Sequence, residues 1–286
     1  MTQSIAAIIV TYNPAPIGLE RLLFSLIGFI PHILVVDNGS AQSLTSRLAT
    51  YESSVSLMQL GENKGIAYAQ NQGIDWAAGR GADYLIFFDQ DSIPESNMVE
   101  VLLDQLDGLI RSGKKVACIG PYFIDSRSEL EVSNASEPSI LSVETIISSG
   151  SIIPVEVIRV VGEMTDELFI DYVDLDWCLR ARSMGYIIYQ SQVAFMYHSL
   201  GDEPISFMGR RWPSRSPFRH YYMCRNAVWM YKNSPANFSW KLIDFLKLVR
   251  KIIFYSIFAK PHFEHIKMMI LGSWHGIAGK MGRYSP

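Results

Sequence analysis

Two aspartates separated by a single residue follow an apolar run, and their spacing suits metal chemistry. Residues 84–88 are aromatic or aliphatic and predict a buried strand, after which come Asp89, Gln90 and Asp91. Two carboxylates this close repel each other unless a cation neutralises them, and hard oxygen ligands suit Mg²⁺ or Mn²⁺. Ligands of open α/β sheets bind beyond the carboxyl ends of the strands. The triplet therefore predicts a divalent cation that holds a diphosphate.

A solvated turn is the alternative interpretation of this triplet, because Asp, Ser92 and Pro94 are common turn formers. Asp-x-Asp is a short pattern, so the triplet alone leaves both interpretations open. His198 ends another predicted strand at residues 193–197. A lone histidine is usually structural, but beside a metal it becomes a candidate third ligand.

Three more carboxylates, Asp171, Asp174 and Asp176, lie within six residues beside large apolar side chains. Carboxylates in such surroundings can be tuned to act as a general base. The alternative for Asp174 is the N-cap of a helix predicted over residues 173–180. We expect a catalytic role for Asp174 and a structural role for Asp176.

Alternating strands and helices must position these clusters. We expect strands at residues 5–10, 33–36, 55–60, 84–88 and 116–120, and helices at 17–29, 44–51, 63–79 and 96–111. The alternation through residue 91 predicts a parallel sheet with right-handed crossovers. Polar residues follow three of these strands, at 11–13, 37–38 and 89–91, which predicts a nucleotide pocket at one sheet edge. No Gly-x-Gly-x-x-Gly follows the first strand, which disfavours a conventional dinucleotide-binding fold.

Composition excludes several classes of protein. The chain has 286 residues, of which 49% are hydrophobic, enough for a large core. Its three cysteines are widely spaced, which disfavours a disulfide framework and favours a reducing compartment. No basic n-region opens the chain, and no uncharged apolar run reaches the roughly 20 residues needed to span a bilayer. We therefore expect a cytoplasmic protein.

The net charge of −3 hides an asymmetry between two predicted regions. Residues 205–286 hold 14 Lys and Arg against 2 acidic residues, a net of +12, whereas residues 1–204 carry a net of −15. We expect residues 1–204 to form the nucleotide-binding and catalytic domain. Residues 205–286 should form a basic, aromatic, helical region that completes the site and suits an anionic partner, either a membrane surface or nucleic acid.

Two segments of this basic region carry distinct patterns. Residues 210–226 are basic and aromatic, which is typical of RNA binding or of a diphosphate clamp. The helical spacing of Arg215, Arg219, Tyr222 and Asn226 favours the clamp. Residues 237–259 predict a basic amphipathic helix that lies on an anionic leaflet, packs on the catalytic domain or forms a dimer interface.

This ordered series of motifs resembles the inverting family 2 glycosyltransferases of GT-A fold, and within them the bacterial rhamnosyltransferases. The similarity covers residues 5–226, and its segments are 10–13, 35–40, 63–67, 71–73, 89–91, 148–150, 171–180, 198–202 and 219–226. The resemblance implies an α/β protein with a Rossmann-like, mostly parallel sheet and a helical C-terminal extension.

The resemblance also implies roles for individual residues. The nucleotide-sugar site would be lined by Thr11, Tyr12, Asn13, Asp37, Asn63, Gly65, Asp89, Gln90, Arg219, Tyr222 and Arg225. In this site Asp37 would face the pyrimidine, and the two arginines and Tyr222 would lie near the diphosphate. The metal, Mg²⁺ or Mn²⁺, would be held by Asp91, Asp89 and His198.

The catalytic base of the family is usually the Asp of a Glu-Asp pair, and alignment back from Arg180 assigns that place to Asp174. Val173 replaces the Glu, which leaves Asp171 as a rival base. The base would take the proton of an acceptor hydroxyl as its oxygen attacks the anomeric carbon.

The implied reaction moves L-rhamnose from dTDP-β-L-rhamnose to a glycan or glycolipid acceptor. That acceptor would be a lipid-linked surface polysaccharide, such as the O-antigen of lipopolysaccharide, at the inner face of the cytoplasmic membrane, and no nucleic acid would take part. Three alternatives stay open: a UDP-sugar donor, a sugar-nucleotide pyrophosphorylase, and a non-catalytic nucleotide- or glycan-binding module. Whether the protein is an oligomer also stays open.

Overall fold

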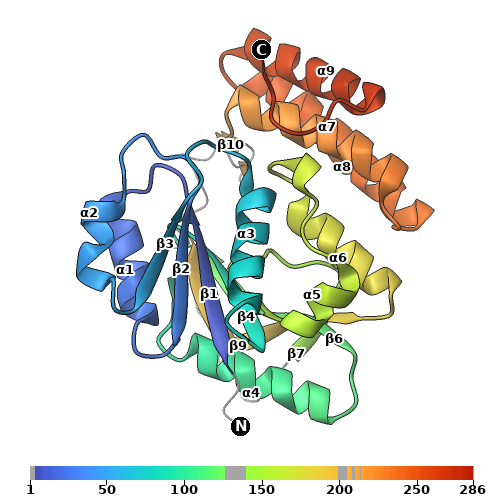
Figure 1. Cartoon of the computed structure of the whole chain (residues 1–286). Helices are drawn as coiled ribbons and strands as arrows, with labels where there is room; N and C mark the ends of the chain where they lie inside the picture. Colours follow the sequence, from blue (N-terminus) through green and yellow to red (C-terminus); the bar gives the residue numbers. More distant parts are fainter. Residues whose placement is uncertain (1–3, 126–139, 199–204, 208–209, 213, 286) are drawn as a thin grey trace.

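A mixed sheet with parallel strands at one end organises the protein. The computed structural model describes residues 4–125, 140–198, 205–207, 210–212 and 214–285. Within these residues the strand order is β3-β2-β1-β4-β8-β6-β9-β5, with β7 beside β9 (Figure 1). The parallel strands at one end are β3 (Val55–Gln59), β2 (His32–Asp37), β1 (Ile5–Thr11) and β4 (Tyr84–Asp89). The predicted parallel βα arrangement of the N-terminal region is confirmed.

The pairing register brings the polar strand ends to one edge, as predicted. Thr11 of β1 lies opposite Asp37 of β2, and Val10 lies opposite Asp89 of β4. The β-branched and aliphatic runs that form these strands are buried on both faces, as expected for parallel strands. Polar residues therefore begin where the buried strands end.

The other half of the sheet is mixed. Its strands are β8 (Ile152–Pro154), β6 (Val116–Asp125), β9 (Ile187–His198), β5 (Ile93–Pro94) and β7 (Ile140–Val143). The short strand expected at residues 193–197 is part of the longer strand β9. β9 is irregular at this point, because its pairing with β6 shifts register between Gln190 and Phe195, and the Ser191 hydroxyl oxygen accepts hydrogen bonds from the amides of Val193 and Ala194 there.

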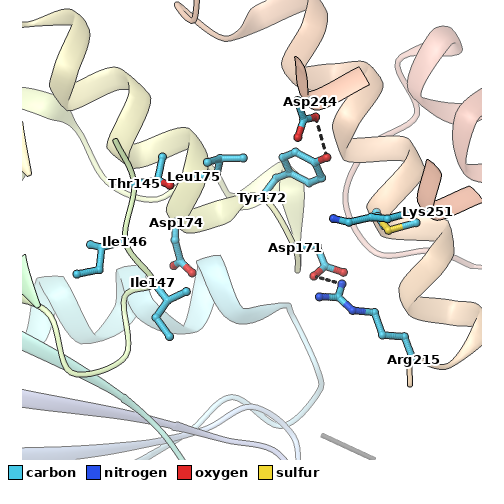
Figure 2. Close-up of a pocket in the computed structure, with 11 residues that line it drawn as sticks. Thr145, Ile146, Ile147, Asp171, Tyr172, Asp174, Leu175, Arg215, Asp244 and Lys251 are labelled. Carbon is cyan, nitrogen blue, oxygen red and sulfur yellow. Dashed lines mark hydrogen bonds and ion pairs between the residues drawn. The ribbon is translucent and has the colours of Figure 1, made fainter. Parts of the chain in front are cut away.

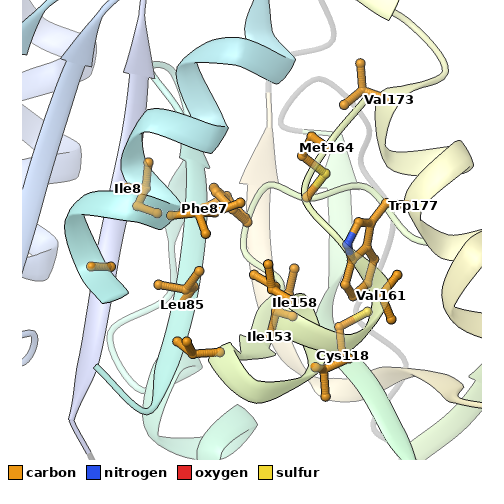
Figure 3. Packing of buried hydrophobic residues seen from close by; sticks show 14 of the residues in the cluster. Ile8, Leu85, Phe87, Cys118, Ile153, Ile158, Val161, Met164, Val173 and Trp177 are labelled. Carbon is orange, nitrogen blue, oxygen red and sulfur yellow. The ribbon is translucent and has the colours of Figure 1, made fainter. Parts of the chain in front are cut away.

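Helices cover both faces of the sheet, and alternate strand residues point into two cores. Ile8 and Phe87 face the core beneath α3, α5 and α6, part of which Figure 3 shows. Their neighbours Ile9 and Phe88 face the core beneath α1 and α4. The helices and helical turns of this part are α1 (Pro16–Leu26), α2 (Thr45–Leu48), η1 (Ala49–Tyr51), α3 (Ile66–Ala78), α4 (Met98–Arg111), α5 (Val155–Val161), η2 (Asp166–Leu168) and α6 (Val173–Ser183).

Three further helices form the C-terminal part, which lies beside the α6 end of the sheet domain (Figure 1). They are α7 (Pro217–Asn233), α8 (Phe238–Phe258) and α9 (His262–Ala278), preceded by the hairpin strands β10 (Ile205–Phe207) and β11 (Arg210–Trp212). Gly272 and Gly276 of α9 permit close contact with α7. A Cβ added at Gly272 would lie 2.2 Å from the Tyr221 carbonyl oxygen.

Candidate active site

Asp37 and its neighbours form a connected polar cluster where β1 and β2 end. The Ser40 amide and hydroxyl donate to the buried Asp37 carboxylate, and the Asn13 amide donates to the Ser40 hydroxyl oxygen at 2.8 Å. Asn13 has a φ of 49° and accepts from the Ala41 amide through its side chain. Thr11 is buried, and its hydroxyl donates to the Val36 carbonyl at 3.4 Å. These contacts fix the backbone and polar groups of this edge.

The Asp89–Asp91 triplet is held beside this cluster. The Ser149 hydroxyl oxygen accepts from the Asp89 amide at 3.0 Å, and Gln90 Oε1 accepts from the Tyr12 amide at 2.8 Å. Asp89 and Asp91 are both partly exposed. The triplet thus presents two carboxylates to the same edge as Tyr12 and Asp37.

The residues at this edge suit a divalent cation whose remaining ligands come from a bound substrate. The described residues contain no group of three metal-ligating side chains. Mg²⁺ commonly binds one or two carboxylates together with substrate phosphate oxygens, which is the set that Asp89, Asp91 and a diphosphate would supply. His198 is the last residue of β9 and follows Tyr197, which pairs with Ile93 of β5. Its backbone therefore lies close to the Asp89–Asp91 triplet. Its side chain lies outside the described structure.

Asp174 lies in the first turn of α6, and Tyr172 occupies the N-cap. The alternative prediction that Asp174 is the N-cap of this helix is therefore wrong. Burial of its carboxyl group and the nearby charges of Asp89 and Asp171 raise its pKa to about 6, although hydrogen bonds from Ser148 oppose this shift. The Ser148 hydroxyl oxygen in turn accepts from Gln70 at 2.9 Å. A carboxylate with this pKa is suited to general-base catalysis near neutral pH.

Asp171 has a different environment from Asp174. Arg219 donates to both of its carboxylate oxygens, at 2.8 and 3.0 Å, and Arg215 donates to one of them at 3.1 Å. Both carboxylate oxygens of Asp171 are therefore engaged by arginines. These contacts orient Arg215 and Arg219 beside Asp171.

The loop that carries Asp171 is strained, and residues of α7 hold it in place. Phe169, Asp171 and Tyr172 all have φ values between 64° and 68°, in the region that favours glycine. Asn226 Nδ2 donates to the carbonyls of Leu168, Ile170 and Asp171 at 2.8–2.9 Å. A buried amide from α7 thus compensates for the backbone strain of the loop.

The structure places Arg225 and Tyr222 away from the strand-end cluster. Arg225 is fully buried, and its guanidinium donates to the carbonyls of Glu167, Leu168 and Gly282 and to the side chain of Asn226. Tyr222 is also fully buried and stacks on Phe169 with ring centroids 4.9 Å apart. Both residues support the strained loop, whereas Arg219 stands beside Asp171. The expected diphosphate contacts of Arg225 and Tyr222 therefore find no support in this geometry.

Asn63 and Gly65 support the same loop from the start of α3. The Ile66 amide donates to the Phe169 carbonyl at 2.7 Å, and a Cβ on Gly65 would lie 2.7 Å from that oxygen. Gly65 also has a φ of 95°. Asn63 Oδ1 accepts from the Asn38 side chain and from the Gly65 amide. These two residues lie between the nucleotide edge and the loop.

A cavity of about 300 Å³ opens beside Asp174, between α6 and the C-terminal helices (Figure 2). Its lining residues are Thr145, Ile146, Ile147, Asp171, Tyr172, Asp174, Leu175, Arg215, Met223, Asp244 and Lys251. The sequence did not mark Asp244 and Lys251 as site residues, because they occur within an amphipathic pattern that is also typical of a surface helix. Only their position beside the acidic cluster could have identified them.

Comparisons with known proteins agree with this geometry. The profile of glycosyl transferase family 2 matches residues 6–134. The chain is 34% identical over 305 residues to the dTDP-rhamnosyl transferase RfbF of Shigella flexneri, a match that covers 99% of this chain and 98% of that protein.

Solved structures show the same fold at low sequence identity. S. aureus TarS 1–349 in complex with UDP-GlcNAc matches with a TM-score of 0.60 and 17% identity, over 96% of this chain and 81% of that chain. GalNAc-T7 with UDP, GalNAc and Mn²⁺ matches with a TM-score of 0.58 and 13% identity, over 91% of this chain and 58% of that chain.

A mixed sheet that is parallel at its N-terminal end, followed by a helical C-terminal part and matched by these structures, is the GT-A architecture of glycosyltransferases. The extent and identity of the RfbF match then settle the family. The chain belongs to the family 2 glycosyltransferases.

Proposed function

We propose that this glycosyltransferase moves L-rhamnose from dTDP-β-L-rhamnose to a hydroxyl of a glycan acceptor, with inversion at the anomeric carbon. The donor assignment rests on the full-length similarity to a dTDP-rhamnosyl transferase. The reaction assignment rests on one observation: Asp174, with its pKa raised to about 6, borders a cavity beside the strand-end cluster.

Asp174 is the general base of this mechanism. Its carboxylate takes the proton of the acceptor hydroxyl while that oxygen attacks the anomeric carbon from the face opposite the leaving group. The C–O bond to the diphosphate breaks in the same step, so the configuration inverts and dTDP leaves. Ser148 and Gln70 hold the Asp174 carboxylate in its orientation.

Charged groups at the strand ends bind the leaving diphosphate. Asp91 and Asp89 would hold Mg²⁺ or Mn²⁺, with His198 as a candidate ligand, and the cation would neutralise charge on the departing diphosphate. Arg219 and Arg215 stand beside Asp171 with further donors for phosphate oxygens. Thr11, Tyr12, Asn13 and Asp37 form the edge that receives the pyrimidine nucleotide, with Gln90 beside them.

A donor panel with and without EDTA tests this proposal. In Mn²⁺, dTDP-rhamnose should raise the melting temperature and be hydrolysed slowly, and EDTA should remove both effects. UDP-glucose, UDP-galactose, UDP-N-acetylglucosamine and GDP-mannose should give neither. The measurements are thermal shift and release of free sugar.

Each other result of the panel has a distinct meaning. A response to a UDP-sugar alone would replace the donor and keep the mechanism. Release of inorganic pyrophosphate from dTTP and a sugar 1-phosphate would identify a pyrophosphorylase. Binding of a donor without any turnover, with or without an acceptor, would indicate a non-catalytic module.

The C-terminal helices suit a peripheral role at an anionic membrane surface, which we propose for a lipid-linked acceptor at the inner face of the cytoplasmic membrane. No helix in the described part of the chain is long and apolar enough to cross a bilayer. Large apolar side chains nevertheless stay exposed on α8 and α9, including Leu246, Ile253, Phe263, Ile270 and Trp274. The surrounding region, residues 205–286, carries a net charge of +12. Apolar insertion together with basic charge is typical of interfacial helices.

Substitution of Ile270 and Trp274 by Glu should abolish flotation with vesicles of mixed phosphatidylglycerol and phosphatidylethanolamine. Both side chains are exposed on α9, so the fold should tolerate the changes, whereas deletion of the helix would remove the packing of Gly272 against α7. Phe24→Glu is the matched control, because Phe24 is 84% exposed on α1. Unchanged flotation of the α9 variant, or equal loss in the control, would contradict the membrane proposal.

A further inference from the structure

The cavity beside Asp174 is built from two parts of the chain that are distant in sequence. Asp174 and Leu175 come from α6, Ile147 from the segment before β8, and Asp244 and Lys251 from α8 (Figure 2). The profile match to the family ends at residue 134, so α6 and α8 both lie outside it. The wall formed by α8 belongs to the C-terminal part of the chain.

Lys251 places a positive charge on this wall of the cavity. Within the described residues its ammonium has no hydrogen-bond or ion-pair partner, although the side chain is partly buried. Burial and the nearby Arg215 charge lower its pKa, and Asp244 and Asp171 oppose that shift. An ammonium kept partly from water without a partner is suited to donate hydrogen bonds to a bound molecule.

Asp244 supplies an acceptor on the same wall. Its Oδ2 accepts hydrogen bonds from the hydroxyls of Tyr172 at 3.0 Å and Tyr231 at 2.9 Å. Both hydrogen bonds end on the same oxygen, so Oδ1 has no hydrogen-bond partner among the described residues. The α8 wall thus presents one donor group and one acceptor group, about two helical turns apart.

The cavity lining carries charges of both signs. It combines two cations, Arg215 and Lys251, with three carboxylates, Asp171, Asp174 and Asp244, while Arg219 pairs with Asp171 from outside the lining. An anionic molecule would therefore gain no net attraction from entering it, whereas a hydroxyl both donates and accepts. Ile147, Leu175 and Met223 add apolar surface for C–H groups.

We infer that this cavity is the acceptor subsite and that α8 makes it specific for an uncharged pyranose, whose adjacent hydroxyls contact Lys251 and Asp244 while a third reaches Asp174. The inference rests on the proposed function, because it takes Asp174 as the base. It assigns to the C-terminal helices the choice of acceptor, in addition to any contact with a membrane.

The test compares transfer with hydrolysis of the same donor. The unmodified protein with dTDP-rhamnose and Mn²⁺ is offered neutral methyl pyranosides (rhamnoside, glucoside, galactoside and N-acetylglucosaminide) and methyl glucuronide. Transfer product and free rhamnose are both quantified. We expect product from at least one neutral pyranoside and none from the glucuronide.

Two cavity variants and one control locate the effect. Lys251→Met should lower the ratio of transfer to hydrolysis about tenfold through a higher acceptor KM, as for a lost charged hydrogen bond. Ile147→Trp should lower the same ratio by filling the cavity while removing no polar group. Lys247→Met, an exposed lysine one turn away on α8, should leave the ratio unchanged.

The outcomes separate the inference from the proposed function. Product from the glucuronide alone, no product from any neutral pyranoside, or unchanged ratios in both cavity variants would overturn the acceptor assignment while hydrolysis upholds the donor. No turnover of dTDP-rhamnose in the unmodified protein would overturn both.

Discussion

Asp174→Asn is expected to lower sugar transfer by about 10³-fold and, at pH 7, to make the folded protein more stable. The rate falls because an amide cannot take the acceptor proton. Stability rises because the pKa of Asp174 is raised from 3.8 to about 6 in the folded protein, so keeping this carboxyl ionised at pH 7 opposes folding by up to about 3 kcal/mol. Asparagine is nearly isosteric and can still accept a hydrogen bond from Ser148.

The sign of the pH dependence follows from the direction of this shift. The folded state binds the Asp174 proton more tightly than the unfolded chain, so the contribution of this group to stability is lost as pH rises from about 4 to 6. The gap in melting temperature between Asp174→Asn and the unmodified protein should therefore be larger at pH 7 than at pH 5. Transfer by the unmodified protein should fall as pH drops below about 6, because the base becomes protonated.

Asp176→Asn is the matched control for this experiment. Asp176 is two residues away and buried, but its carboxylate accepts from Thr165 at 2.7 Å and from Arg180 at 2.9 Å. Its replacement should lower the melting temperature and change the transfer rate of the folded fraction little. A less stable Asp174→Asn protein at pH 7, or one that retains transfer, would contradict the assignment of Asp174 as base.

Arg225→Met is expected to destabilise the protein by about 4 kcal/mol. Methionine fills much of the same volume, but the carbonyls of Glu167, Leu168 and Gly282 would lose the guanidinium that now satisfies them. Each buried polar group left without a partner costs about 1–3 kcal/mol. The lost hydrogen bonds belong mainly to the loop that contains Phe169 and Asp171, whose positive φ values already make its backbone strained.

Arg219→Met distinguishes a supporting arginine from a ligand-binding one. Its pair with Asp171 is partly exposed, so the stability change should stay within about 1 kcal/mol, while the KM for dTDP-rhamnose should rise. Urea unfolding and donor kinetics measure both variants. If the Arg225→Met protein is stable and its KM for dTDP-rhamnose is raised, Arg225 binds the diphosphate, and its assignment as a support of the strained loop is wrong.

Much of the nucleotide edge could be predicted from the sequence. The runs at 5–10, 33–36 and 84–88 are apolar without interruption, which is typical of strands buried on both faces, and polar residues follow each run. Parallel strands place their carboxyl ends together, so Thr11, Asp37 and Asp89 had to meet once the strands were correct. The roles implied for these residues by resemblance stay proposals.

Two arginines of α7 show the limit of prediction from local sequence patterns. Arg219 and Arg225 occur in one basic, aromatic segment, and the family resemblance implied that both lie near the diphosphate. In the structure Arg219 is partly exposed beside Asp171, whereas Arg225 is fully buried among backbone carbonyls. Their difference depends on what packs around the helix, including α9 and the strained loop, and no periodicity within α7 encodes those partners.

The sequence by itself determined the strand-ending carboxylates, the acidic segment around Asp174 and the basic C-terminal helices, because each depends on neighbours within a few residues. Only the tertiary structure decided which carboxylate is enclosed beside Ser148 and which is paired with Arg215 and Arg219. It also decided that Lys251 faces the cavity of Asp174. The reason is physical: burial, desolvation and ion pairing arise from groups far apart in the chain, and a pKa or a binding cavity exists only once they are packed together.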